Sequence, residues 1–159
     1  MERSHKGFTL IELMVVIAII AILTAIITAN FSKARANSRD VKRIYDLSQI
    51  QLALELFFDR CNAYPQPGSN NTLPATTATV ATCPGGITLA TFISPIPTPP
   101  NSGEVYDYAV NNSTTATDYI LRSKIESTNS VLNDDVDGTV YTLDCSDSPT
   151  FYYCVQPKL

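Results

Sequence analysis

The feature that most constrains this chain is a long apolar segment near its amino terminus. Between Phe8 and Ala29, 18 of 22 residues are apolar, and Glu12 carries the only charge. As a helix rising about 1.5 Å per residue, the segment measures about 33 Å, enough to cross a hydrocarbon layer of about 30 Å. The sequence therefore predicts that residues 8–29 cross a membrane once.

Basic residues lie on both sides of this segment. Arg3 and Lys6 precede it, and basic residues before an apolar segment favour a cytoplasmic amino terminus. A larger basic group follows the segment and by count alone favours the opposite orientation. We expect this group to contact either lipid headgroups or acidic neighbours such as Asp40 and Asp46. Its members are Lys33, Arg35, Arg39, Lys42 and Arg43.

Three interpretations of the apolar segment compete. A secretory signal needs a small-residue cleavage site, and the candidate, Ala34-Arg35-Ala36, lies far beyond the apolar core. A plain membrane anchor is the second interpretation. Neither explains Glu12, because a carboxylate within an apolar segment costs roughly 2.5 to 3.5 kcal/mol and needs a partner or a function.

The third interpretation gives Glu12 a role. The run Lys6-Gly7-Phe8-Thr9-Leu10-Ile11-Glu12 and the aliphatic residues after it resemble the prepilin signal of type IV pilins and of the pseudopilins of type II secretion. The resemblance implies that a membrane peptidase removes residues 1–7 by cutting between Gly7 and Phe8, and methylates the new amino group of Phe8. It also implies that Glu12 pairs with the Phe8 amine of a neighbouring subunit in a filament. Ala21 and Ala29 stand where type IV pilins often carry a helix-breaking glycine and proline.

The helix is expected to continue beyond the apolar segment. No proline or glycine occurs between Phe8 and Pro65, and apolar residues recur at spacings of three and four from Ile44 to Phe58. This spacing predicts an amphipathic continuation over residues 30–60 whose apolar side packs against the rest of the chain. The sequence Asn62-Ala63-Tyr64-Pro65 is expected to end it.

The last segment, residues 61–159, is predicted to be a loop-rich β head. Residues 65–103 contain eight of the ten prolines and are expected to form surface loops. Four runs rich in β-branched and aromatic residues follow, over 105–110, 118–125, 138–143 and 150–155. We therefore expect an α+β fold in which the long helix packs on a four-stranded antiparallel sheet, which resembles the pilin fold.

All four cysteines lie in the predicted head, where an even number indicates disulfides. Of the three pairings that four cysteines allow, we favour Cys61 with Cys83 and Cys145 with Cys154, because sequence neighbours close short loops. A bridge near the carboxyl end also resembles the one that many pilins carry. A zinc site is the rival interpretation, but none of these cysteines has the close spacing of a zinc ligand pair.

Residues 133–144 follow the spacing of a calcium-binding loop, with oxygen-bearing side chains at Asn133, Asp135, Asp137 and Asp144 and a glycine at Gly138. The family resemblance supports calcium, because major pseudopilins bind it in the equivalent part of the head. Strand-like flanks exclude a true EF-hand. We favour an Asp-Gly turn between strands and keep the calcium site as the alternative.

Composition argues against several classes of function. His5, the only histidine, lies in the predicted leader, so a mature chain has no histidine for a catalytic triad or a metal site. The net charge of −4 argues against specific nucleic-acid binding through a basic surface. We therefore expect that the chain is not an enzyme.

The leading hypothesis is a structural subunit of a type IV pilus-like filament that serves adhesion, motility or DNA uptake. The resemblance implies four partners: further copies of the chain, the prepilin peptidase, an inner-membrane assembly platform and, before assembly, membrane lipid. It also implies a single-pass protein of the cytoplasmic membrane with its head outside, which later joins an extracellular filament. A major pseudopilin of type II secretion is the alternative, and a monomeric membrane-anchored binding module is the second alternative.

Overall fold

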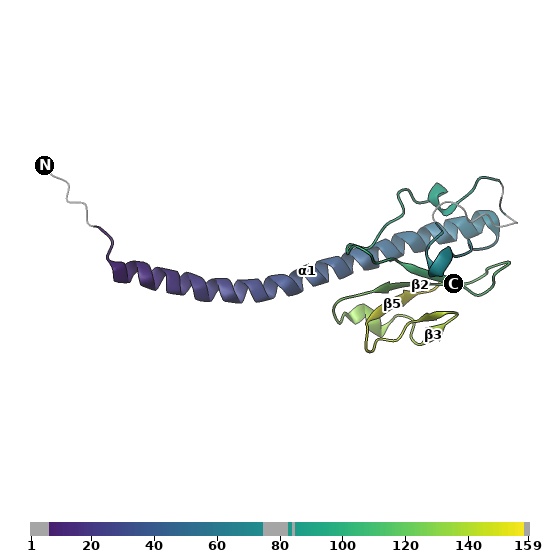
Figure 1. Cartoon of the computed structure of the whole chain (residues 1–159). Coiled ribbons are helices and arrows are strands. Elements are labelled where there is room, and N and C mark those ends of the chain that lie inside the picture. The colour runs from purple at the N-terminus through teal and green to yellow at the C-terminus, as the bar shows by residue number, and fades with distance from the viewer. Residues whose placement is uncertain (1–6, 75–82, 84, 158–159) are drawn as a thin grey trace. The chain divides into compact units, whose positions relative to one another are not determined.

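The computed structural model describes residues 7–74, 83 and 85–157, the side chains of residues 28–30 excepted. Residues 1–6 of the predicted leader lie outside this range. Contacts divide the chain into two units, residues 1–36 and 37–159, which are described one at a time. One helix, α1 (Leu10–Cys61), contributes residues to both units (Figure 1).

Helix α1 is unbroken over its 52 residues. It contains neither proline nor glycine, so nothing in its sequence removes a backbone hydrogen bond or adds a flexible position. It passes through Ala21 and Ala29 without interruption. It ends where the sequence predicts, because Asn62 adopts a left-handed conformation, with φ 55°, and donates its N–H to the carbonyl of Phe58.

The amino-terminal unit has no buried core among its described residues. Its large apolar side chains are exposed, from 51% for Val16 to 91% for Phe8. By length and composition this part of α1 could cross a membrane, a property that signal sequences and core helices share. A helix that is apolar on all sides needs lipid or other protein around it. The partners of this unit therefore lie outside it.

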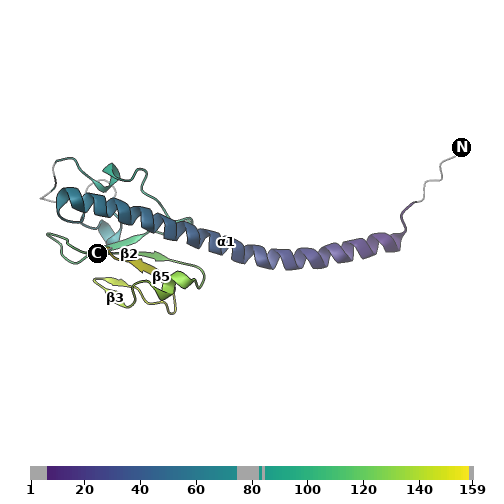
Figure 2. The ribbon, with the colours of Figure 1, turned by 180° about the vertical axis from the view of Figure 1, so that it is seen from behind.

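In the second unit, the head, the buried apolar residues form three clusters, and the largest of them includes one side of α1. Leu47, Ile50, Leu54 and Phe57 are completely buried, as the predicted amphipathic pattern requires. The first three pack with aromatic and aliphatic side chains of the sheet, including Tyr108, Tyr119 and Leu121, whereas Phe57 belongs to a smaller cluster. In Figures 1 and 2, which view the molecule from opposite sides, β2 and β5 lie beside the carboxyl-terminal half of α1.

The main sheet of the head has three antiparallel strands in the order β1-β2-β5. These are β1 (Asp107–Val110), β2 (Tyr119–Lys124) and β5 (Tyr152–Val155). The central strand β2 pairs Leu121 with both Tyr108 and Val155. The α+β class is thus confirmed, with the helix packed on an antiparallel sheet.

The predicted four-stranded sheet differs in one respect, because the third predicted strand does not join it. Residues 138–143 instead contribute to a separate hairpin of β3 (Thr139–Val140) and β4 (Leu143–Asp144). Tyr141, at the turn, has a positive φ of 54°, and this local reversal pairs the segment with itself. A run of strand-forming residues predicts extended backbone but does not reveal where the chain turns back.

The proline-rich segment forms loops, as predicted, but part of it belongs to the core. Among its described residues the only helical turns are the short η1 (Ser69–Asn71) and η2 (Leu89–Thr91). Leu89 is fully buried, and four further apolar side chains of this segment pack on the same core, namely Leu73, Phe92, Ile93 and Ile96. Part of the segment therefore covers the core, and the rest of its described residues lie at the surface.

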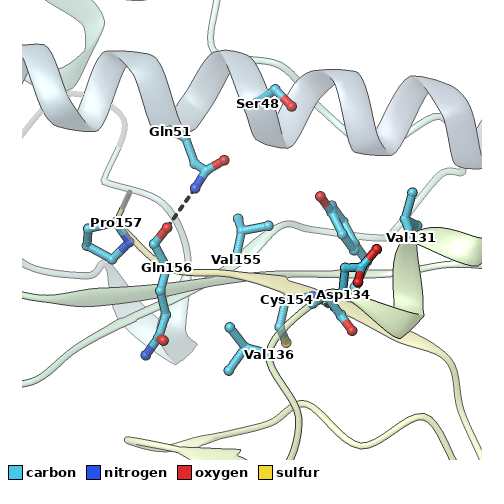
Figure 3. Close-up of a pocket in the computed structure, with 11 residues that line it drawn as sticks. Ser48, Gln51, Val131, Asp134, Val136, Cys154, Val155, Gln156 and Pro157 are labelled. Carbon is cyan, nitrogen blue, oxygen red and sulfur yellow. Dashed lines mark hydrogen bonds between the residues drawn. The ribbon is translucent and has the colours of Figure 1, made fainter. Parts of the chain in front are cut away.

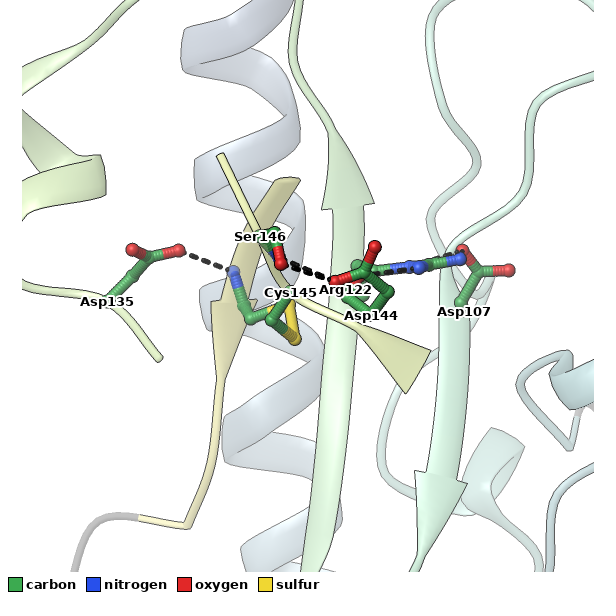
Figure 4. The surroundings of a disulfide bond; sticks show 7 residues. Asp107, Arg122, Asp135, Asp144, Cys145 and Ser146 are labelled. Atoms are coloured by element: carbon green, nitrogen blue, oxygen red, sulfur yellow. Dashed lines mark hydrogen bonds and ion pairs between the residues drawn. A yellow bond between two sulfur atoms is a disulfide. The ribbon is translucent and has the colours of Figure 1, made fainter. Parts of the chain in front are cut away.

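The structure joins Cys61 to Cys83 and Cys145 to Cys154, the pairing that short loops favour. Around the second bridge, Arg122 fixes the carboxyl-terminal segment to the sheet (Figure 4). Its guanidinium donates to Asp107 Oδ2 at 2.8 and 3.0 Å and to the Asp144 carbonyl at 2.7 Å. It also lies 4.2 Å from the centroid of the Tyr152 ring.

Candidate functional site

The amino-terminal motif forms a specific hydrogen-bonded arrangement at the start of α1. Thr9 is the residue before the helix, and its N–H and hydroxyl both donate to Glu12 Oε2, at 2.8 and 2.7 Å. In return, the Glu12 N–H donates to Thr9 Oγ1 at 3.3 Å. This is a capping box, in which two side chains satisfy backbone donors that the first helical turn leaves free. Gly7 and Phe8 are exposed beside it.

The capping box explains how the single charge of the apolar segment is held. Negative charge is favoured at a helix amino terminus, where unpaired N–H groups point outward. Both donors of Thr9 bind the same oxygen, and no described residue bonds to Glu12 Oε1. Cutting the chain between Gly7 and Phe8 would leave Thr9 and its N–H in place. The arrangement can therefore persist in a processed chain and still offer one carboxylate oxygen to an outside partner.

Thr9 was not among the predicted site residues. The signal that identifies it is present in the sequence, because threonine followed by glutamate three residues later is the capping-box pattern. Glu12 therefore has a second role, at the helix end, besides the predicted pairing with an amine.

A buried ionic cluster lies at the base of the head. Arg43 and Asp40 are both completely buried and pair at 2.9 Å. Arg43 also reaches Glu104 at 2.7 Å and Glu126 at 2.9 Å. Asp40 accepts hydrogen bonds from the N–H groups of Glu126 and Ser127 at 2.9 and 3.0 Å. The cluster thus connects α1 to the loop before β1 and to the loop after β2.

Two further basic residues of the predicted group also pair within the head. Arg39 binds Glu126, whose pKa is lowered to about 2, chiefly by the hydrogen bond from Arg39 and also by Arg43. Lys42 pairs with Asp46 and donates to the Thr98 carbonyl. Asp40 and Asp46 thus pair with members of the basic group, which is one of the two contacts that the sequence predicted for it.

Lys33 and Arg35 behave differently from the other three. Both are exposed, and neither forms an ion pair with any residue that the structure describes. The guanidinium of Arg35 lies 4.7 Å from the centroid of the Phe31 ring, one helical turn away. Phe31 itself is 56% exposed.

A cluster of carboxylates lies near the second disulfide. Asp135, Asp137 and Asp147 can place one oxygen each within 4.8 Å of one another. Asp135 Oδ2 accepts the Cys154 N–H at 2.8 Å, whereas Asp135 Oδ1 and Asp147 Oδ1 are buried and have no partner among the described residues. The pKa of Asp135 is raised to about 6, mainly by burial and also by the charges of Asp147 and Asp137.

This cluster overlaps only partly with the predicted calcium ligands. Asp135 and Asp137 belong to it, but Asp144 instead accepts hydrogen bonds from the N–H and hydroxyl of Ser146, at 3.0 and 2.6 Å. Asn133 is exposed at the end of η3 (Ser130–Asn133). The sequence did not predict Asp147 as a member of the cluster, because it lies outside residues 133–144, whose spacing predicts the loop. The bridge from Cys145 to Cys154 brings its segment beside Asp135, which binds the Cys154 N–H.

A groove of about 520 Å³ runs between α1 and β5 beside this cluster (Figure 3). Gln51 of α1 crosses one end of it and donates to the Gln156 carbonyl at 2.8 Å. Asp134, Asp135 and Tyr153 are the ionisable groups of its lining, since Cys154 is in a disulfide. This lining offers carboxylates and a phenol but, among its described residues, no nucleophile paired with a base.

Comparisons with known proteins identify relatives of the amino-terminal segment. Residues 3–28 match the family described as the prokaryotic N-terminal methylation motif. The type IV major pilin protein PilA of Myxococcus xanthus is 43% identical over 60 residues, which cover 38% of this chain and 27% of that protein. The type IV wide pilus major component PilA4 of Thermus thermophilus is 58% identical over 38 residues, covering 24% of this chain and 29% of that protein.

A type II secretion protein is also similar to this chain. The type II secretion system core protein G of Aeromonas hydrophila is 33% identical over 64 residues, covering 40% of this chain and 45% of that protein. This chain therefore spans less than half the length of these curated relatives, and no solved structure matches it significantly. The amino-terminal segment thus carries the N-terminal methylation motif, and the chain is similar over part of its length to type IV pilins.

Proposed function

We propose that this chain is a structural subunit that polymerises through α1 into a type IV pilus-like filament. The observation that carries the proposal is the amino-terminal unit itself. Its apolar side chains are exposed on all sides, and Glu12 keeps one carboxylate oxygen free of any described partner. Neighbouring copies would bury both features at once, so that the chain acts by assembly and not by catalysis.

Processing would create the complementary charge. Removal of residues 1–7 by a prepilin peptidase leaves Phe8 with a methylated, positively charged amino group. That amine and Glu12 are each costly to bury alone, and their mutual pairing offsets this cost. Because Thr9 holds one oxygen of Glu12, the amine of a neighbouring copy would bind the other oxygen. An inner-membrane assembly platform would bring the copies together.

The proposal places the chain in the cytoplasmic membrane before assembly, with residues 8–29 across the bilayer and the head outside. Residues 30–60 would continue the helix into residues 61–159. After assembly the head would lie on the surface of a filament that serves adhesion, motility or DNA uptake.

Two substitutions of Glu12 test the assembly step. Glu12→Ala removes the carboxylate, and we expect filaments seen by electron microscopy to be lost while the chain remains in the membrane. Glu12→Gln keeps the shape and a hydrogen-bonding oxygen but removes the charge, so it separates charge pairing from capping. Glu55→Gln, a substitution of a head carboxylate bonded to Tyr64 and Tyr119, is the matched control. Normal filaments from Glu12→Ala would contradict the proposal.

Processing is tested at Gly7. No atom lies near enough to contact a Cβ added there, so Gly7→Val should leave the fold unchanged. We expect mass spectrometry to find N-methylated Phe8 at the start of the mature chain and to find the leader retained in Gly7→Val. An intact Met1 in the unsubstituted protein, or a start at Asn37, would instead support a plain anchor or a secretory signal.

A major pseudopilin of type II secretion is the second candidate function, favoured by the similarity to the Aeromonas hydrophila core protein G. A monomeric membrane-anchored binding module is the third. Deletion of the gene separates these candidates. Loss of surface filaments supports the pilus, loss of a secreted enzyme supports the pseudopilin, and loss of neither supports the monomeric module.

We also propose that the cluster of Asp135, Asp137 and Asp147 binds calcium. Hard cations prefer carboxylate oxygens, and the two buried oxygens without a described partner, on Asp135 and Asp147, are suited to this role. A cation there would tie the segment before β3 to the disulfide loop. We expect calcium chloride to raise the melting temperature of the full chain in detergent, and Asp147→Asn to abolish this rise. Asp144→Asn is the control, because Asp144 bonds to Ser146.

A further inference from the structure

The basic residues that follow the apolar segment fall into two sets. Arg39, Lys42 and Arg43 are held by carboxylates of the head. Lys33 and Arg35 are exposed and form no ion pair with any described residue. The carboxylates that pair with the first set form no ion pair with the second set among the described residues.

The position of the second set in the sequence indicates which partner its charges would meet. Lys33 follows Ala29, the last residue of the apolar segment, by about 6 Å along the helix, and Arg35 by about 9 Å. The headgroup layer on each side of a bilayer is about 5 to 8 Å thick. Long basic side chains can also extend along the helix to keep their charges at that depth. Both side chains would therefore reach the phosphate layer when residues 8–29 cross the membrane.

Phe31 adds a second interfacial feature on the same turn. Its ring is 56% exposed and lies 4.7 Å from the guanidinium of Arg35. An aromatic ring at the edge of an apolar segment, next to a cation, is typical of residues that fix a helix at a membrane surface. Phe31, Lys33 and Arg35 are all exposed within their own unit.

We infer that Phe31, Lys33 and Arg35 form an interfacial anchor that binds phospholipid phosphates on the head's side of the membrane. The anchor prefers anionic lipid and sets the depth of the apolar segment before assembly. This inference rests on the proposed membrane insertion. A second copy of the chain is the other candidate partner. The lipid is favoured because both cations follow the apolar segment within six residues of Ala29.

The absence of tryptophan from the sequence allows a direct test. Phe31→Trp keeps an aromatic ring and introduces the only tryptophan of the full chain. The protein is reconstituted in equimolar phosphatidylcholine and phosphatidylglycerol, with bromine atoms on one lipid or the other. We expect stronger quenching by brominated phosphatidylglycerol. Lys33→Gln and Arg35→Gln should each lower this preference by about five-fold.

The matched control is the pair Arg60→Gln and Lys124→Gln, which removes two exposed head cations that form no ion pair with a described residue. It should leave the lipid preference unchanged. Equal quenching by both brominated lipids would overturn the inference. Loss of the preference for phosphatidylglycerol on addition of free inorganic phosphate would also overturn it. Protection of the introduced tryptophan that grows with protein density would identify a second copy as the partner and also overturn it. Absence of quenching by any brominated lipid would overturn the proposed membrane insertion as well.

Discussion

The two units of this chain differ in how far their charged groups have partners within the same unit. In the head, Arg43 and Asp40 are completely buried, yet every charged group of their cluster has a partner within the same unit. In the amino-terminal unit, Glu12 is held by Thr9 through one oxygen only, and Lys33 and Arg35 have no carboxylate partner among the described residues. The apolar side chains differ in the same way, since those of the head core are buried and those of residues 8–27 are exposed.

This contrast shows which unit is complete on its own. Burial of apolar surface contributes about 25 cal/mol per Å², so exposed side chains such as Ile20 and Leu23 represent stabilisation that the isolated chain does not obtain. The head already obtains this stabilisation, because its apolar core side chains are buried. Substitutions in the head should therefore change the stability of one chain, whereas those in the amino-terminal unit should change what the chain associates with.

The largest effect on stability is expected at the buried cluster. Arg43→Ala leaves Asp40 buried without its cation, and removing one member of a buried pair typically costs about 3 to 5 kcal/mol. We expect the free energy of unfolding of the head, measured by urea titration in detergent, to fall by this amount. Arg60→Ala, which removes an exposed arginine from the same helix, is the control. Equal stability of the two variants would show that the head does not depend on its internal charges.

The second effect concerns the disulfide beside the carboxylate cluster. Cys145 and Cys154 are nine residues apart, and closing a loop of that size in the unfolded chain contributes about 2.7 kcal/mol. We expect replacement of both cysteines by serine to lower the free energy of unfolding by about this amount. The melting temperature should also cease to respond to calcium, because the segment of Asp147 is no longer held beside Asp135. If the melting temperature of this variant still rose with calcium, the cation site would not depend on the bridge.

The third effect is a dependence on acid. The pKa of Glu126 falls from 4.5 in the unfolded chain to about 2 in the head, so its ionised form is stabilised by folding. This stabilisation is complete above pH 4.5 and is lost as the pH falls towards 2. We expect Glu126→Gln to cost about 1 kcal/mol at neutral pH and to flatten the profile in that window. Asp135, with its pKa raised to about 6, acts in the opposite direction, because its stabilising protonated form is lost as the pH rises through 6.

Sequence patterns predicted the parts of this molecule that depend on local order. The helix from Leu10 to Cys61 follows from the lack of proline and glycine, and its buried face follows from the spacing of apolar residues. The amino-terminal motif needed no structure to be found. The separate hairpin of β3 and β4 was not predicted, because a single positive φ at Tyr141 decides where the strand turns back.

Long-range pairing explains the other differences. Asp147 joins Asp135 through a disulfide and a backbone hydrogen bond, neither of which leaves a fixed spacing in the sequence. Likewise, the sequence shows five basic residues after the apolar segment but does not show which of them pair with carboxylates of the head. Lys42 pairs with Asp46, only four residues away, but Arg39 and Arg43 depend on Glu104 and Glu126, which lie more than 60 residues further along the chain.

The smallest effect on stability is expected at Thr9, and it distinguishes the two units most sharply. Thr9→Val keeps the shape of the side chain but removes the hydroxyl that donates to Glu12 and accepts from its N–H. Loss of a helix cap costs about 0.5 to 2 kcal/mol, and here only the first turn of α1 should feel it. We expect hydrogen exchange to quicken at residues 10–13 in Thr9→Val and to be normal in Thr9→Ser, with urea unfolding of the head unchanged in both. Faster exchange in the head core would mean that the two units are coupled, and that the contrast between an incomplete helix and a self-sufficient head is wrong.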